Sequence, residues 1–139
     1  MYKLFNHSTL WGNIQRLKYL PQAIKYRFQR AFRGWADCDT WDMDFWFMEV
    51  MKPMLQHLRD THTSHPGNLT EEAWNVVLNR MIFLLNEMDE NTCSRQIIFG
   101  RGSGKSKDFQ RLIDVCKYRA ACKDEFFRLF SKYFYDLWN

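Results

Sequence analysis

The chain has 139 residues, which fits one domain of ordinary size and leaves little room for a second. Apolar residues make up 46% of it and aromatic residues 17%, a composition that excludes a disordered chain. The net charge of +4 is small for a dedicated duplex-DNA binder, yet residues 1–36 carry seven Lys or Arg and no acidic residue. We therefore expect a local basic surface that binds an anionic partner.

The first predicted helix covers about residues 21–33 and extends back toward residue 13. Pro21 suits its first turn and Gly34 suits its end. An apolar stripe recurs at steps of three and four, formed by Leu17, Leu20, Ile24, Phe28, Ala31 and Trp35. The basic residues occupy the rest of the circumference, either as a solvated face or as a binding surface.

A second helix is predicted from an N-cap at Asp39 or Thr40 to about residue 62, with Asp42 and Asp44 favouring its dipole. Pro53 inside it predicts a kink. Two apolar stripes run along this helix, which indicates a central position in a bundle or contact with another subunit. One contains Trp41, Phe45, Met48, Leu55 and Leu58, and the other contains Met43, Phe47, Val50 and Met54.

Two further helices complete the predicted fold. Residues 64–68 have turn chemistry, and Thr70 begins a third helix with a core stripe of Trp74, Val77, Leu78, Met81, Leu85 and Met88. A flexible basic loop is expected at residues 91–106, with a short strand at 96–99. The last helix covers about residues 107–137, bends near Cys122 and carries the stripe Leu112, Ile113, Cys116, Ala120, Phe127, Phe130 and Phe134.

Together the elements predict an all-α single domain over residues 1–139, a compact bundle of about four helices with a kinked central helix and one long basic loop.

Two motifs suggest enzymatic activity, but their contexts argue against it. The Gly-rich residues 100–106 miss the phosphate-binding P-loop spacing by one position, and no alternating strands and helices carry them. They form either a plain surface loop or an anion-contacting one. His7-Ser8-Thr9 and His62-Thr63-Ser64 match phosphoesterase pairs that lie on facing strands in a β-rich fold. We expect no enzyme and keep a cyclic-nucleotide phosphoesterase as the least favoured alternative.

The sequence predicts no metal site, no cofactor and no transport across a membrane. Its four cysteines include no Cys-x-x-Cys pair and no zinc-ligand spacing. No acidic or thiolate ligand stands at fixed spacing beside His57, His62 and His65. The chain also lacks a signal-peptide apolar region and an apolar run of about 18 residues. A reducing cytoplasm, without a membrane partner, is the expected location.

The densest candidate site lies around residues 27–44. Four carboxylates within residues 37–44 suit helix capping, acid-base chemistry or a divalent metal. For a nucleotide ligand, Asp37 or Asp39 would instead accept hydrogen bonds from a base while arginines hold the phosphates. Trp35 and Trp41 either stack on a base or belong to the core.

Residues 26–88 resemble a family of small, uncharacterised proteins of tailed bacteriophages. The resemblance rests on RFQRAFRG at residues 27–34, ADCDTWDMD at 36–44, TH at 61–62, HP at 65–66 and LTEEAW at 69–74. The closing FSKYFYDLW at 130–138 also looks like the family's end, whereas residues 91–106 have no counterpart. This family is similar to the viral sponge proteins that bind cyclic dinucleotide signals of the bacterial CBASS defence.

The resemblance implies a phage immune-evasion protein in the host bacterial cytoplasm that sequesters a cyclic dinucleotide without cleaving it. It also implies a homo-oligomer, specifically a tetramer. The residues expected to bind the ligand are Arg27, Arg30, Arg33, Trp35, Asp37, Asp39, Trp41, His62 and His65. The main alternative is a small basic adaptor or inhibitor that binds a host protein or nucleic acid through the same face.

Overall fold

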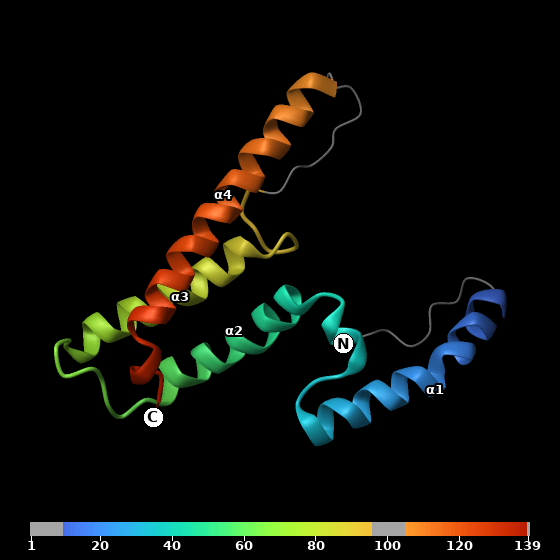
Figure 1. The fold of residues 1–139 in the computed structure, drawn as a ribbon, viewed down its shortest axis with the longest axis horizontal. Helices are drawn as coiled ribbons and strands as arrows, with labels where there is room; N and C mark the ends of the chain where they lie inside the picture. Colours follow the sequence, from blue (N-terminus) through green and yellow to red (C-terminus); the bar gives the residue numbers. More distant parts are fainter. Residues whose placement is uncertain (1–9, 96–104, 139) are drawn as a thin grey trace. The chain divides into compact units, whose positions relative to one another are not determined.

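The computed structural model describes the backbone of residues 10–95 and 105–138 and the side chains of residues 20–95 and 109–138. Within these ranges the chain is all-α, with no strand, and its four α-helices are shown in Figure 1. They are α1 (Leu10–Arg33), α2 (Met43–Thr61), α3 (Glu71–Met88) and α4 (Lys105–Lys132). Short 3₁₀ turns, η1 (Asp37–Thr40) and η2 (Phe134–Asp136), precede α2 and follow α4. The strand expected at residues 96–99 lies outside the described residues.

The chain divides into two compact units, Met1–Trp46 and Phe47–Asn139. In the described part of the first unit, η1 packs against α1. In the second unit, α3 packs against α4 and both contribute to a core that also receives side chains from α2. The predicted all-α class is therefore confirmed.

The first unit differs from the expectation at two points. Pro21 lies in the middle of α1 and not in its first turn, because the helix already begins at Leu10. Pro21 removes one backbone donor, and the helix continues across it. The predicted N-cap of α2 at Asp39 or Thr40 is also wrong, since both residues belong to η1 and α2 starts only at Met43. The predicted stop at Gly34 is confirmed by its left-handed φ of 79°.

The core of the second unit centres on α3. Trp74, Leu78, Met81 and Leu85 are fully buried, as their spacing predicted, and Thr70 caps the helix by accepting a hydrogen bond from the Ala73 N–H. From α2, Met48 and Leu55 are buried in this core. Pro53 lies inside α2 and lacks the donor for one ladder bond, but the helix runs on to Thr61.

The apolar stripe of α4 was predicted one position away from the observed one. Cys122 and Phe126 are buried, and Leu129 and Phe130 are packed against the core. Five of the predicted stripe residues are instead exposed: Leu112, Cys116, Ala120, Phe127 and Phe134. The aromatic residues of α4 are so dense that two neighbouring stripes fit the same pattern. The helix is also not broken near Cys122, where a break or bend was expected, because α4 is one helix from Lys105 to Lys132.

Candidate anion-binding site

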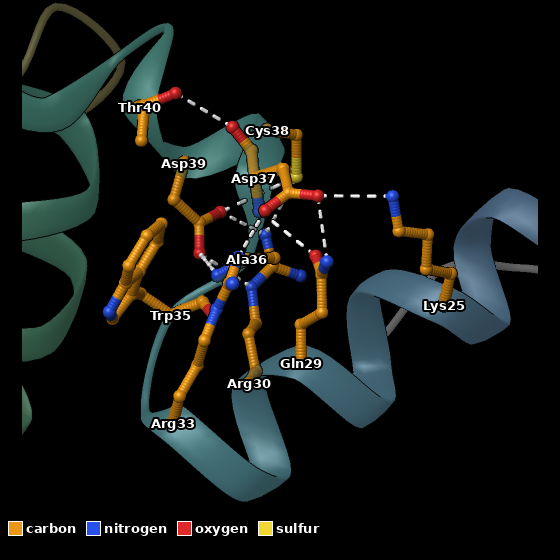
Figure 2. Close-up of polar contacts among 10 residues, drawn as sticks. All are labelled: Lys25, Gln29, Arg30, Arg33, Trp35, Ala36, Asp37, Cys38, Asp39 and Thr40. Carbon is orange, nitrogen blue, oxygen red and sulfur yellow. Dashed lines mark hydrogen bonds and ion pairs between the residues drawn. The ribbon is translucent and has the colours of Figure 1, made fainter.

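The candidate site is built by a chain reversal at the end of α1. Gly34 takes a left-handed conformation, and its N–H donates to the Arg30 carbonyl at 3.0 Å, which ends the helix. Buried Ala36 follows, and η1 then places two carboxylates beside the last turns of α1. Figure 2 shows the side chains of Lys25, Gln29, Arg30 and Arg33 directed from α1 toward η1.

Asp39 forms the more enclosed half of this contact. Arg30 meets its carboxylate as a fork, with Nε donating to Oδ2 at 3.0 Å and a second guanidinium nitrogen donating to Oδ1. The Ala36 N–H also donates to Oδ2, at 2.7 Å. The Asp39 side chain is only 8% exposed. The hydrogen bonds from Arg30, with that from Ala36, lower the pKa of Asp39 to about 2.

Asp37 forms the open half. Its carboxylate accepts a hydrogen bond from Gln29 Nε2 at 2.7 Å and pairs with Lys25 Nζ at 3.0 Å and with the Arg33 guanidinium. The Gln29 side-chain oxygen in turn accepts from the Asp37 N–H at 3.0 Å. The hydrogen bond from Gln29, followed by those from Arg33 and Lys25, holds the pKa of Asp37 well below its usual range. Unlike Asp39, Asp37 is 46% exposed, so solvent reaches its ion pairs.

Aromatic surface lies beside these charges. The Arg33 guanidinium stacks over the Trp35 ring, 3.9 Å from its centroid, and Arg33 Nε donates to the Trp35 carbonyl. Trp35 is exposed, and Trp41 is more so, at 76%. Neither indole is therefore a core residue in this structure. Arg27 is exposed as well and forms no ion pair with the residues that the structure describes.

The structure thus brings together five of the nine predicted site residues, namely Arg30, Arg33, Trp35, Asp37 and Asp39. Arg30 contacts Asp39, and Arg33 contacts both Asp37 and Trp35. Sequence reasoning missed Lys25 and Gln29. Their signal was the four-residue spacing of positions 25, 29 and 33, which places them on the same face of a helix as Arg33. We call the set Lys25, Gln29, Arg30, Arg33, Asp37 and Asp39 the ion-pair cluster.

The two predicted histidines belong to the second unit and not to the ion-pair cluster. His62 Nε2 lies 3.1 Å from Asn75 Oδ1, and His65 Nδ1 lies 3.2 Å from the Pro66 carbonyl oxygen. The first contact joins the residue that follows α2 to Asn75 on α3, and the second lies within the turn between these helices. His7 and most of the loop at residues 100–106 lie outside the described residues.

Within the part of the chain that the structure describes, no three His, Cys, Asp or Glu side chains are grouped so that they could hold a metal ion. Over the same part, no helix is both long and apolar enough to cross a bilayer.

Comparison with protein-family models, curated proteins and solved structures finds no match to this chain.

Proposed function

We propose that the chain binds a cyclic dinucleotide and sequesters it without cleavage, acting as a phage immune-evasion protein in the host bacterial cytoplasm. The observation that carries this proposal is the exposed, cation-rich and Trp-flanked half of the ion-pair cluster around Asp37. A cyclic dinucleotide presents two phosphates and two aromatic bases, and this surface offers a complement to both.

The phosphate would replace Asp37 as the anionic partner of Arg33 and Lys25. These three side chains are accessible, whereas Asp39, the partner of Arg30, is enclosed and accepts an additional hydrogen bond from the Ala36 N–H. Exchange of one exposed anion for another keeps the cations paired and avoids a new desolvation cost. Arg30 and Asp39 would then support the turn, and ligand contact would fall to Lys25, Arg27 and Arg33.

The charge and the aromatic surface agree with a small dianion. The ion-pair cluster together with Arg27 contains four cations and two carboxylates, which leaves two positive charges. A long polyanion would require a larger excess. Trp35, already stacked with Arg33, and exposed Trp41 provide flat surfaces on which bases can stack.

The same proposal includes assembly of the chain into a homo-oligomer, which the resemblance implies to be a tetramer. It is supported by exposed apolar residues near and within α2, including Trp41, Met43 and Met54. Apolar side chains in such positions favour contact with a second subunit.

Incubation with a panel of cyclic dinucleotides, removal of free ligand and heat release test the proposal directly. Mass spectrometry of the released material should find intact cyclic dinucleotide. We expect Arg33→Gln to lower retention roughly tenfold, as for loss of one charge-assisted phosphate contact. Arg128→Gln, which removes an exposed arginine from α4, is the matched control and should retain wild-type binding.

The same experiment separates the alternatives. Release of linear product would identify a phosphoesterase, and absence of retention would refute both ligand proposals. An adaptor that binds nucleic acid through the basic face would show affinity that falls steeply with salt and does not depend on nucleotide identity. The exposed Arg27 is the observation that favours this second candidate.

A further inference from the structure

The face of α1 that points away from η1 is apolar and exposed. Leu20, Ile24 and Phe28 recur every four residues, and Phe32 continues the same series. All four are exposed, with Phe32 at 84%, and the rings of Phe28 and Phe32 stack with centroids 6.2 Å apart. We call these four residues the outer stripe. A stripe of this kind on a charged helix normally requires a partner.

The opposite side of α1 is already occupied. Gln29, Arg30 and Arg33 direct their polar groups to the carboxylates of η1, as Figure 2 shows. At about 100° per residue, Arg30 and Phe28 lie on opposite sides of the helix. Between Lys25 and Arg33, η1 therefore contacts the polar side of α1, and the apolar outer stripe lies on the other side of the helix.

Basic residues border the outer stripe on both edges. By the same helical geometry, Lys25, whose ammonium group is paired with Asp37, lies along one edge, and Arg27 lies along the other. Both are exposed, and no acidic residue occurs anywhere in α1. A partner that covers the outer stripe therefore meets cations at the edges of the stripe. This favours a partner with an anionic surface.

We propose that α1 lies in the plane of an anionic lipid bilayer, with the outer stripe buried among the acyl chains and with Arg27 at the level of the headgroups. A helix with a basic polar part and a Phe- and Leu-containing apolar face suits this interface. The exposed cation at the edge of the stripe would lie where the anionic headgroups of such a bilayer are. In-plane binding requires no spanning helix, and none is found among the residues that the structure describes.

Flotation of the full chain with vesicles tests this inference. Vesicles of phosphatidylcholine with phosphatidylglycerol should carry the protein to the top of a density gradient, and vesicles of phosphatidylcholine alone should not. We expect Phe32→Ser to weaken partitioning roughly tenfold, as expected for withdrawing one aromatic side chain from an apolar phase. Arg27→Gln should weaken it roughly fivefold and reduce its dependence on salt.

Matched controls come from α4. Phe109→Ser removes a phenylalanine that is 64% exposed, and Arg111→Gln removes an exposed arginine. Both variants should float like the wild type, and circular dichroism of all four variants checks that their helix content is unchanged. Equal loss of binding in a control and in its α1 counterpart would overturn the assignment to the outer stripe.

Two other results would also overturn it. Binding that is equal for neutral and anionic vesicles would refute the role of the basic edges. Absence of flotation, with a Phe32→Ser variant that has a lower mass by light scattering, would mean that a second copy covers the stripe. Cyclic dinucleotide retention is measured on the same samples without vesicles, so failure of the lipid proposal and failure of the ligand proposal are distinguished.

Discussion

Asp37 and Asp39 stand two positions apart, carry the same charge and are both paired with arginine, yet their surroundings give them different roles. Asp39 is enclosed and accepts from a backbone N–H as well as from Arg30, so it holds η1 against α1. Asp37 is open to solvent and has only side-chain donors for its carboxylate. The difference in exposure, and not the residue type, is what marks Asp37 as the exchangeable partner.

Asp37→Asn tests whether this carboxylate competes with the ligand or reads a base. In the proposed exchange, the substitution frees Arg33 and Lys25 and should increase cyclic dinucleotide affinity roughly tenfold, by loss of one competing charge-assisted contact. If Asp37 instead accepts hydrogen bonds from a base, affinity should fall. Isothermal titration calorimetry of the wild type and the variant shows whether the affinity rises or falls. Asp60→Asn on α2 serves as a control for a change in net charge.

The pairing of Arg30 with Asp39 predicts an acid-sensitive turn. The pKa of Asp39 is lowered from 3.8 to about 2 by the hydrogen bonds from Arg30 and Ala36, so the charged carboxylate is favoured in the folded state. The resulting stability is present above the unfolded pKa and is lost as the pH falls from about 4 to about 2. A pH titration followed by carbon-13 NMR of the Asp39 carboxyl should show a titration midpoint well below the usual value for an aspartate. Arg30→Gln should raise that midpoint. An unchanged midpoint in that variant would contradict the pairing.

At the scale of single residues, the sequence indicated the right neighbourhood but not the contacts. Arg30, Arg33, Asp37 and Asp39 were all assigned to the ligand, because a run of cations followed by carboxylates suits a nucleotide. The structure shows that these residues also bind one another. That outcome depends on the reversal at Gly34, and a glycine alone does not specify the direction in which the following chain leaves a helix.

Among the elements, the joint between α1 and η1 is the most specific. Gly34 adopts φ of 79°, and a Cβ atom added there would meet nothing within 4 Å. Gly34→Ala should therefore lower the unfolding free energy by about 1 kcal/mol, because an alanine is strained in the left-handed backbone conformation. Urea denaturation followed by the helical circular dichroism signal measures it.

Gly67 provides the matched control for this prediction. It is likewise free of neighbours within 4 Å, but its φ is outside the left-handed region. Gly67→Ala should leave the unfolding free energy within about 0.5 kcal/mol of the wild type or raise it slightly. Equal effects at the two positions would show that the left-handed turn is not what Gly34 supplies.

Element positions were predictable where apolar spacing and capping agreed, and less so where either was ambiguous. The stripe and the Thr70 cap of α3 were predicted because both signals point to the same start and the same face. In α4, adjacent Phe126 and Phe127 allow two faces, and only packing against α3 selects Phe126. In α1, Pro21 suited a first turn by local preference, but local preference does not exclude a proline from the interior of a helix.

For the molecule as a whole, stability is concentrated in the second unit, where the buried cluster of α2, α3 and α4 lies. The described side chains of α1, by contrast, are all at least partly exposed. The all-α class follows from the composition and from the helical spacing of the apolar residues alone. The division into two units does not, because every helix has an apolar stripe in the sequence and nothing in the pattern reveals which stripes are left uncovered.

Phe126 is the central aromatic of that cluster, and its truncation tests where the stability resides. It is fully buried and its ring lies 6.0 Å from that of Phe47 and 5.7 Å from that of Phe130. Phe126→Ala should lower the unfolding free energy by about 3–5 kcal/mol, through lost burial and a residual cavity. Phe109→Ala removes an exposed ring from the same helix and should cost less than about 1 kcal/mol. Urea denaturation of both variants, with the slope of the transition compared to the wild type, measures this difference, and similar losses would mean that α4 is not buried on the face containing Phe126.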